Sequence, residues 1–375
     1  MSPGAPGAFA TIPGTDPLRV VVVGAGAMGQ AWLRNVQSTP EVELVGIVDV
    51  DRDAAARAAA AYGPHVPVGD DLTEVAARGG AQAVIDVTAP VAHRAVNSQA
   101  LRAGLPVLCE KPIAPTVAET LALVAEAELS GQLLMTSQSR RYYPALARLK
   151  AAVATLGDIG LLTTEFFKAP HFGGFRDEMD DPLLVDMAIH QFDVARYLLD
   201  AEPIAVDCRS FNPSWSWYRG DAAATATFEF AGGTRFVYTG SWCSPGLETS
   251  WNGSWRVSGA HGTARWDGDG EPESDVAREA DPAAGEVRPE IAGALDEFVQ
   301  ALRTGRIPSG EVHANVHTIT MVEAAVRSAR TGASVRLADV IADAYRAAIA
   351  AEPDPAIRDV LDSWGSTDDV RERLR

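Results

Sequence analysis

The sequence predicts an α/β protein that consists of an N-terminal doubly wound parallel sheet and a C-terminal α+β domain with a largely antiparallel, open sheet. Up to about residue 138, short continuous apolar runs alternate with helical stretches, which is typical of parallel strands with helices on both faces. Beyond about residue 140, longer segments of alternating apolar and polar residues follow one another, as in antiparallel sheets. The length of 375 residues also favours two domains over one core.

The first strand is the β-branched run Leu18–Val23, which ends abruptly in a glycine-rich segment. A second strand, Glu43–Asp49, ends on an acidic residue. Strands and helices then alternate over Asp53–Ala61, Asp70–Arg78, Ala83–Val87, Pro90–Ala103, Pro106–Cys109, Thr116–Ser130 and Leu133–Thr136. Capping residues and stop glycines mark the ends of the helices. We therefore expect the first domain to cover residues 18–138.

The second domain is expected over residues 139–340. Its helices and strands are predicted at Pro144–Val153, Leu161–Lys168, Leu183–Leu199, Ile204–Asn212, Ala222–Phe230, Thr234–Trp242, Trp251–Ser258, Ile291–Thr304, Val312–Thr331 and Val335–Leu337. An acidic stretch, Asp267–Glu286, is rich in glycine and proline and is expected to be an exposed loop. Residues 1–17 are expected to form a loose leader, and residues 341–375 a charged, amphipathic C-terminal appendage.

The composition limits the classes of function. A hydrophobic fraction of 47% with 22% charged residues is typical of a soluble globular protein, and no apolar stretch is long enough to cross a bilayer. The net charge of −18 argues against nucleic acid or an anionic membrane as the main partner. Cys109, Cys208 and Cys243 are far apart and odd in number, and the leader lacks the features of a secretion signal. These features predict a cytoplasmic protein.

The segment Gly24-Ala25-Gly26-Ala27-Met28-Gly29 fits the dinucleotide-binding pattern of a Rossmann domain. Gly24 would allow a sharp turn, Gly26 the approach of a diphosphate, and Gly29 close packing of the helix that follows. Ala27 and Met28 would start this helix, whose N-terminal amides favour phosphate. A lone glycine pattern can mark an ordinary turn, but here a strand precedes it and an acid follows at a suitable distance.

Asp49 is that acid. It lies 20 residues after Gly29, where a carboxylate would accept hydrogen bonds from an adenosine ribose. A 2′-phosphate would be repelled there, so the sequence predicts NAD as the cofactor. Arg52 lies close enough in sequence to leave NADP as the alternative.

Several motifs together resemble the Gfo/Idh/MocA oxidoreductase family. They are Val87-Thr88-Ala89-Pro90-Val91-Ala92-His93, Pro106-Val107-Leu108-Cys109-Glu110-Lys111-Pro112 and the helix Asp186-Met187-Ala188-Ile189-His190-Gln191-Phe192-Asp193. The resemblance covers about residues 18–340, including a closing helix and strand near Val326–Leu337. In one place the sequence departs from the family. Asp180-Asp181-Pro182 stands where many members carry paired glycines, which puts the shape of the substrate pocket in doubt.

The resemblance implies roles for residues of the first domain. Thr88, Pro90, His93, Glu110 and Lys111 would contribute to the cofactor site, although His93 could equally lie on a helix surface. Lys111 would hydrogen-bond the substrate hydroxyl and stabilise its developing oxyanion character, with a cis peptide to Pro112 aiming it. Without the resemblance, Lys111 would be read as a solvated loop charge.

In the second domain, Asp186 and His190 are four residues apart and share one face of a predicted helix. By resemblance, His190 would be the general base and Asp186 would orient it or contact a substrate hydroxyl. The alternative is an amphipathic helix with a polar pair, but the helix is mostly apolar, and a buried Asp/His pair is costly without a purpose. Asp193 would bind a substrate hydroxyl or support the site; capping or solvent exposure is an equal alternative.

Other candidates are less specific. Arg140 could meet the substrate, with a surface charge as the alternative, and His171 could line the pocket. Trp215 and Trp217 could stack on a sugar or simply pack. His313 and His317 have helical spacing, but no third ligand is evident and no metal is expected.

Together these observations predict an NAD-dependent dehydrogenase that oxidises a secondary alcohol of a sugar, inositol or related polyol, or reduces the ketone. A homo-dimer or homo-tetramer is expected by resemblance. Two alternatives stay open: a redox-neutral, NAD-dependent glycosidase of the same family and a non-catalytic NAD-sensing regulator.

Overall fold

A computed structural model describes residues 7–63, 66–276 and 288–374 and divides the chain into two compact units. Unit 1 comprises Met1–Ser139, Ile291–Val316 and Ala342–Arg375, and unit 2 comprises Arg140–Glu290 and His317–Ile341. The first boundary lies next to the predicted one. The division differs from the prediction for residues 291–316 and 342–375, which belong to the unit of the parallel sheet.

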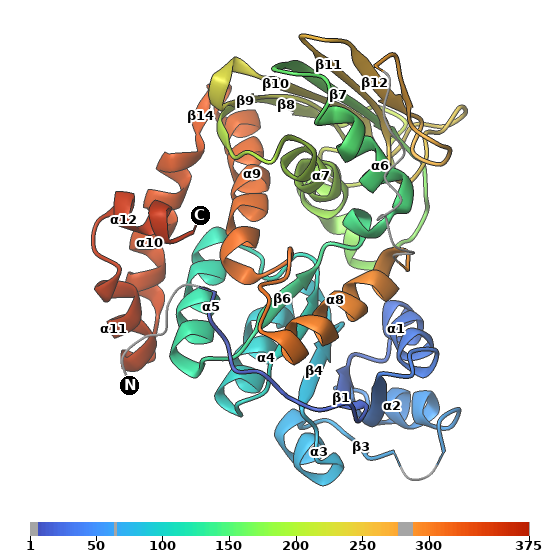
Figure 1. The fold of residues 1–375 in the computed structure, drawn as a ribbon, viewed down its shortest axis with the longest axis vertical. Helices are drawn as coiled ribbons and strands as arrows, with labels where there is room; N and C mark the ends of the chain where they lie inside the picture. Colours follow the sequence, from blue (N-terminus) through green and yellow to red (C-terminus); the bar gives the residue numbers. More distant parts are fainter. Residues whose placement is uncertain (1–6, 64–65, 277–287, 375) are drawn as a thin grey trace. The chain divides into compact units, whose positions relative to one another are not determined.

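Unit 1 is built on a parallel sheet of six strands in the order β3-β2-β1-β4-β5-β6 (Figure 1). The strands are β1 (Leu18–Val23), β2 (Val42–Val48), β3 (Val68–Gly69), β4 (Ala83–Asp86), β5 (Val107–Glu110) and β6 (Leu134–Ser137). Because β2 and β4 lie on opposite sides of β1, the chain changes direction across the sheet between β1 and β4. The predicted doubly wound fold is confirmed, and ligands of such folds bind at this switch point.

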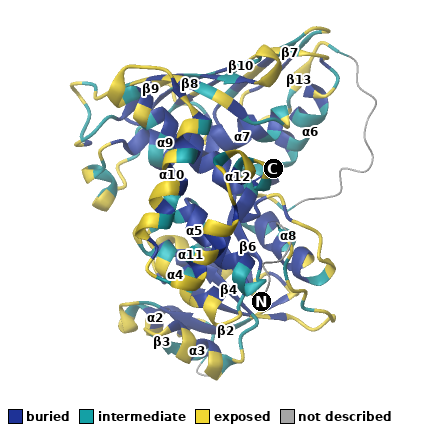
Figure 2. Cartoon of the chain, turned by 90° about the vertical axis from the view of Figure 1, so that its left-hand side faces the viewer, coloured by how far each residue is buried: buried dark blue, intermediate teal, exposed yellow. Residues whose placement is uncertain are grey.

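Helices connect these strands and cover the sheet. They are α1 (Ala27–Gln37), α2 (Arg52–Ala59), α3 (Leu72–Gly79), α4 (Pro90–Arg102) and α5 (Val117–Ser130). The sheet strands are buried, whereas α2 and α3 have exposed outer faces (Figure 2). Thr116 caps α5 through its side chain, as the sequence predicts, and Asp71 caps α3 in place of the expected Asp70.

The described part of the N-terminal segment is tied to unit 1. The backbone N–H groups of Ala10 and Ile12 donate to the carbonyls of Gly131 and Leu302 at 2.8 Å each. Arg303 also donates to the Ile12 carbonyl at 2.7 Å. Within the expected leader, Ala10 and Ile12 thus have backbone partners in unit 1, and residues 1–6 lie outside the described residues.

The C-terminal helices are equally part of unit 1. After α8 (Glu290–Thr304) and α9 (Val312–Thr331), the chain forms α10 (Leu337–Ala351), α11 (Pro355–Ser363) and α12 (Thr367–Arg373), and α11 packs against α5 (Figure 1). The predicted appendage at residues 341–375 is thus helical and, from Ala342 onward, packed on the parallel-sheet unit.

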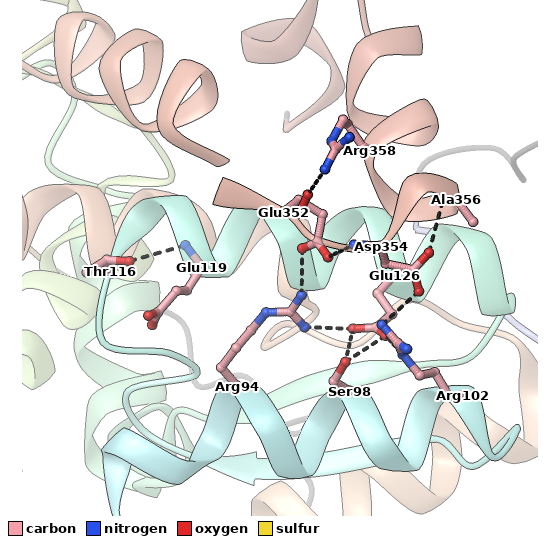
Figure 3. Close-up of polar contacts among 10 residues, drawn as sticks. All are labelled: Arg94, Ser98, Arg102, Thr116, Glu119, Glu126, Glu352, Asp354, Ala356 and Arg358. Atoms are coloured by element: carbon pink, nitrogen blue, oxygen red, sulfur yellow. Dashed lines mark hydrogen bonds and ion pairs between the residues drawn. The ribbon is translucent and has the colours of Figure 1, made fainter. Parts of the chain in front are cut away.

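Ion pairs that include the buried carboxylates of Glu126 and Glu352 hold this C-terminal segment (Figure 3). Arg94 of α4 bridges Glu126 of α5 and Glu352 with N–O distances of 2.6 and 3.0 Å. Arg102 bridges Glu126 and Asp354 at 2.7 and 2.9 Å. Glu126 is only 2% exposed, so its charge depends on these arginines.

A second cluster lies around Glu128, two residues further along α5. Glu128 accepts hydrogen bonds from both sides of the Arg373 guanidinium at 2.6 and 2.8 Å and from the Trp364 indole at 3.1 Å. His313 lies between Glu128 and Glu311, at 2.9 and 2.8 Å. Burial lowers the pKa of His313, but its hydrogen bonds to the two glutamates outweigh the burial and raise the pKa to about 9.

Unit 2 is built on an eight-stranded sheet in the order β13-β12-β11-β7-β10-β9-β8-β14. The strands are β7 (Ile159–Phe167), β8 (Pro203–Phe211), β9 (Ala223–Phe230), β10 (Arg235–Ser241), β11 (Ser254–Gly259), β12 (Thr263–Trp266), β13 (Glu273–Ser274) and β14 (Val335–Arg336). All pairings are antiparallel except β7 with β10. The predicted largely antiparallel sheet is confirmed.

The helix predicted over Leu183–Leu199 consists of two parts. A π-helical segment, Leu183–Ala188, precedes α7 (Ile189–Leu199), and α6 (Pro144–Val153) packs against α7. Phe192 fixes α7 on the sheet through edge contacts with aromatic rings of β9 and β10.

Two further predictions concern the chain as a whole. Of the expected acidic loop Asp267–Glu286, the last ten residues lie outside the described residues, and the first part contains β13. None of the helices that the structure describes is both long and apolar enough to cross a membrane.

The His313 cluster generates a prediction for stability. Because the folded-state pKa of about 9 exceeds the ordinary value of 6.5, the proton stabilises the folded state fully below pH 6.5, and this contribution is lost as the pH rises through 9. The shift corresponds to roughly 3 kcal/mol. Urea unfolding of the wild type and His313→Gln across this range should show a difference that shrinks with pH; a constant difference would contradict the assignment.

Candidate active site

In the glycine-rich turn between β1 and α1, the surroundings explain separately why each of the three positions is a glycine. Gly24 has φ +102°, and a Cβ on it would lie 2.6 Å from the Val87 carbonyl oxygen at the end of β4. A Cβ on Gly29 would lie 2.1 Å from the Gly24 carbonyl oxygen. Gly26 instead faces open space, with no atom within 4 Å of a Cβ there, and no side chain caps α1. The free helix N-terminus therefore suits an anionic group.

A cavity of ≈ 360 Å³ adjoins this turn. Its lining includes the ends of three neighbouring strands, with Gly24 and Gly26 after β1, Asp49 after β2 and Thr88 after β4. Of the other cofactor candidates, Ala27 and Met28 start α1 and Pro90 starts α4. Together with His93, Glu110 and Lys111, they are not among the described residues that line this cavity.

The Asp49 carboxylate is fixed by backbone donors. Its two oxygens accept hydrogen bonds from the N–H groups of Ala25 at 2.7 Å and Asp51 at 2.9 Å. Arg52, the residue that left NADP open, forms an ion pair with Asp70 at 2.5 Å. The cavity thus presents a carboxylate, while the neighbouring guanidinium already has an acidic partner.

Lys111 follows β5 at the same edge of the sheet. The preceding Glu110 accepts hydrogen bonds from the Trp32 indole at 2.8 Å and from the backbone N–H of Lys111 at 3.2 Å. Desolvation raises the pKa of Glu110, with these two hydrogen bonds acting against it. The peptide between Lys111 and Pro112 is cis, as the resemblance suggested.

His93 lies in the first turns of α4 and is 1% exposed, so it is not a helix-surface histidine. Its Nδ1 is 2.6 Å from the carbonyl oxygen of Pro112, and its Nε2 is 2.9 Å from that of Thr88. Asp86, which is fully buried, accepts hydrogen bonds from the N–H and the hydroxyl of Thr88 at 3.0 and 2.7 Å. His93 therefore connects the turn after β4 with the turn after β5.

Asp86, His93 and Cys109 have potential ligand atoms within 4.8 Å of one another. This group does not suit a metal ion, because both ring nitrogens of His93 already lie at hydrogen-bond distance from backbone carbonyl oxygens. Burial also raises the pKa of the Cys109 thiol well above its ordinary value, which disfavours the thiolate that a metal needs.

In unit 2, Asp186 lies in the π-helical segment and His190 in the first turn of α7, and both side chains are buried. The Asp186 carboxylate accepts a hydrogen bond from Nε of Arg176 at 2.6 Å. Arg176 in turn lies over the rings of Phe175 and Phe172, 4.7 and 5.6 Å from their centroids. The sequence analysis missed Arg176, which follows a glycine-rich loop and carries no motif of its own.

Asp193, expected as a substrate ligand or a supporting residue, lies in a buried charge network. Both of its oxygens accept hydrogen bonds from Arg141 at 2.7 Å, and Thr318 donates to it at 2.8 Å. Asp193 is 1% exposed. These contacts fit the supporting role better than direct contact with a substrate.

The remaining candidates also have defined surroundings. Arg140 is mostly buried and donates to Tyr143 and Asn252 at 3.2 Å each, so it is not an ordinary surface charge. His171 stacks on Trp217, with 3.6 Å between ring centroids and 24° between planes. Trp217 is therefore a packing partner, while Trp215 is 64% exposed.

The aromatic wall that contains Trp217 extends toward Asp186. Tyr218 packs against Trp217 and Trp242 at 5.1 and 5.7 Å between centroids. Burial, together with the carboxylates of Asp177 and Asp186, raises the pKa of Tyr218 to about 12. Unit 2 therefore places the buried aromatic residue Tyr218 close enough to Asp186 for the two groups to interact electrostatically.

Comparison with protein families finds two matches. Residues 18–138 match the family model described as "Oxidoreductase family, NAD-binding Rossmann fold", and residues 146–265 match that of the GFO/IDH/MocA C-terminal domain. Together these ranges cover more than half of the chain.

Individual relatives are similar over different lengths. The protein y4oX of Sinorhizobium fredii is 27% identical over 88% of this chain and 98% of its own length. D-apiose dehydrogenase of Paraburkholderia graminis is 26% identical over 86% and 90%. Inositol 2-dehydrogenase 1 of Saccharopolyspora erythraea is 32% identical, but the match spans only 50% of this chain and 56% of the relative.

Solved structures share the fold. An oxidoreductase from Agrobacterium radiobacter, in complex with NAD+, L-tartaric acid and magnesium, superimposes with a TM-score of 0.76 at 20% identity. It covers 86% of this chain and 99% of its own. The WlbA dehydrogenase from Bordetella pertussis, in complex with NADH and UDP-GlcNAcA, also gives 0.76 at 20% identity, over 87% and 98%.

The charge network around Asp193 generates a prediction that separates a supporting role from substrate contact. Asp193→Asn should destabilise unit 2 by roughly 3 kcal/mol, because it leaves the buried Arg141 without its counter-charge. Urea unfolding measures this change, with Asp180→Asn, whose carboxylate pairs with Arg219 near the surface, as the matched control. Unchanged stability together with a raised KM would instead indicate a substrate ligand.

Proposed function

Because the chain belongs to the GFO/IDH/MocA family of oxidoreductases with an NAD-binding Rossmann domain, we propose that it is an NAD-dependent dehydrogenase. It oxidises a secondary alcohol of a sugar, inositol or related polyol, or reduces the matching ketone. The observation that carries the proposal is the cavity at the carboxyl ends of β1, β2 and β4, where Asp49 faces the glycine-rich turn. The dehydrogenase names of the inositol and apiose relatives support the substrate class.

The residues present fit a dinucleotide. The open space over Gly26 and the uncapped start of α1 would receive the diphosphate, and the Asp49 carboxylate would accept hydrogen bonds from the ribose. The same carboxylate would repel a 2′-phosphate, and Arg52 already pairs with Asp70. NAD is therefore the proposed cofactor over NADP.

Bound NAD supplies a nicotinamide carbon that accepts the hydride. In the proposed mechanism, an imidazole nitrogen of His190 takes the proton of the substrate hydroxyl. The Lys111 ammonium donates a hydrogen bond to the same oxygen and stabilises the negative charge that develops on it as the hydride leaves. Lys111 is one of only three lysines in the chain.

Asp186 orients the base. It lies four residues before His190, and its carboxylate is held by the short hydrogen bond from Arg176. A neighbouring guanidinium favours the ionised form of a carboxyl group. An ionised Asp186 stabilises the imidazolium that forms on His190 when it takes the proton.

The assembly state stays a prediction. By resemblance we propose a homo-dimer or homo-tetramer, which light scattering coupled to size-exclusion chromatography would identify.

An absorbance assay at the NADH band tests the activity. The protein is mixed with NAD and a panel of inositols, aldoses, amino sugars and sugar acids. We expect a signal with one substrate class and a loss of about 10³-fold in kcat for Lys111→Ala, because the oxyanion loses its donor. Lys150→Ala is the matched control, since Lys150 lies over the ring of Tyr197 and has no role in the proposed mechanism.

Two results would overturn the dehydrogenase. Turnover of a nitrophenyl glycoside without net absorbance change, with NAD released on denaturation, would indicate the redox-neutral glycosidase. NAD binding without any turnover over the whole panel would indicate a sensor.

The role of Asp49 is tested separately. Asp49→Ser should lower the ratio of kcat/KM for NAD to that for NADP by about 10-fold or more, since charged hydrogen bonds to the ribose are lost and the repulsion of a 2′-phosphate is removed. Asp53→Ser removes an equal charge nearby, from the first turn of α2, and should leave the ratio unchanged. An unaltered ratio in Asp49→Ser would refute the assignment.

A further inference from the structure

His93 occupies an unusual hydrogen-bonding position. Its two ring nitrogens lie 2.6 and 2.9 Å from the carbonyl oxygens of Pro112 and Thr88, with geometry suited to hydrogen bonds. A carbonyl oxygen can only accept, and a neutral imidazole carries a single N–H. A neutral ring would therefore place one nitrogen lone pair against an oxygen at hydrogen-bond distance. Both contacts are favourable only when the ring carries two protons.

The surroundings provide the counter-charge that a buried imidazolium requires. Asp86 is fully buried and has a carboxylate oxygen within 4.8 Å of a ring nitrogen of His93. Burial raises the pKa of Asp86, and the charge of His93 and the hydrogen bonds from Thr88 act in the opposite direction. Glu110 also interacts electrostatically with His93. Asp86 and Glu110 are thus the two acidic groups that interact with the charge of His93.

The ring also links two backbone segments that the proposed chemistry uses. The Thr88 carbonyl belongs to the turn after β4, which lines the cavity at the glycine-rich turn. The Pro112 carbonyl belongs to the residue directly after Lys111. A shift of the ring would therefore move the backbone beside Lys111 relative to the cavity wall.

We propose that His93 is a positioning residue that fixes Lys111 through the Pro112 carbonyl, with both ring nitrogens donating to backbone carbonyl oxygens, rather than a ligand of the cofactor. The part of this inference that concerns catalysis rests on the proposed dehydrogenase activity. The protonation state of His93 does not depend on that activity and is tested without it.

The first experiment is ¹⁵N NMR of the full chain with ¹⁵N-labelled histidine, with the His93 signals assigned by their loss in His93→Gln. At about pH 8.5, about two units above the ordinary histidine pKa, a neutral ring shows two different nitrogen environments, one protonated and one not. We expect both nitrogens of His93 to give protonated-type signals. An unprotonated-type nitrogen at His93 would overturn the proposal.

The second experiment measures positioning. His93→Gln keeps a polar side chain but removes the rigid ring that contacts both carbonyl oxygens. We expect kcat to fall by about 10- to 100-fold, because Lys111 is then misplaced. The dissociation constant for NADH, followed by fluorescence, should change by less than about threefold, because His93 does not line the cavity. The matched control is His261→Gln, the same change at an exposed histidine of unit 2.

A readout independent of turnover follows the lysine itself. The rate of amine acylation at each of the three lysines is measured by mass spectrometry, with Lys150 and Lys168 as internal references. In His93→Gln the relative rate at Lys111 should change, whereas His261→Gln should leave it unchanged. Equal relative rates and equal kcat in folded His93→Gln would refute the positioning role. Absence of turnover in the wild type would refute the dehydrogenase alone, leaving the NMR and acylation results to decide the inference.

Discussion

The close approach of two backbone segments at Gly24 is the constraint on which the rest of unit 1 depends. Because this glycine lacks a Cβ, the end of β1 can lie against the Val87 carbonyl at the end of β4, the point at which the strand order reverses. This approach positions Thr88 on the cavity wall. From there, His93 connects the Thr88 carbonyl to the Pro112 carbonyl after β5. Three successive strand ends are thus joined by one steric contact and one side chain.

Buried charges are compensated by arginine in nearly every cluster described here. Glu126 depends on Arg94 and Arg102, and Asp193 on Arg141. In a chain with a net charge of −18, a buried carboxylate gains little from its surroundings unless a cation lies in direct contact with it. The planar fork of Arg141 supplies two parallel hydrogen bonds to the Asp193 carboxylate, whereas Arg94 and Arg102 each donate one hydrogen bond to Glu126. The same interaction attaches the C-terminal helices to α4 and α5, so their place in unit 1 follows from charge pairing as well as from apolar packing.

Local patterns could be predicted from the sequence, and long-range partners could not. The glycine-rich turn, the acid after β2 and most helix and strand positions depend on neighbours within a few residues, which the sequence shows directly. Asp186 and Asp193, by contrast, lie close together in sequence, and only the structure shows that they have different hydrogen-bond partners. Asp186 meets Arg176, whereas Asp193 is enclosed by Arg141 and Thr318, a residue 125 positions away. For the same reason, the composition of residues 7–17 could not show that Ile12 has hydrogen-bond partners as distant in sequence as Leu302 and Arg303.

The choice of lysine at position 111 can be understood against this background. Arginine is the cation in most of the ion pairs described above. The chain has only three lysines, and one of them follows β5. Arginine would bring a broad, always charged plane that pairs best with a carboxylate, and the neighbouring Glu110 would be a competing partner. The compact ammonium of lysine is a single point of positive charge on a flexible stem, and it is suited to one oxygen rather than to a fork of two. Because this stem is flexible, the backbone that carries it must be held in place. The buried His93 ring, which contacts the Pro112 carbonyl, provides this anchor.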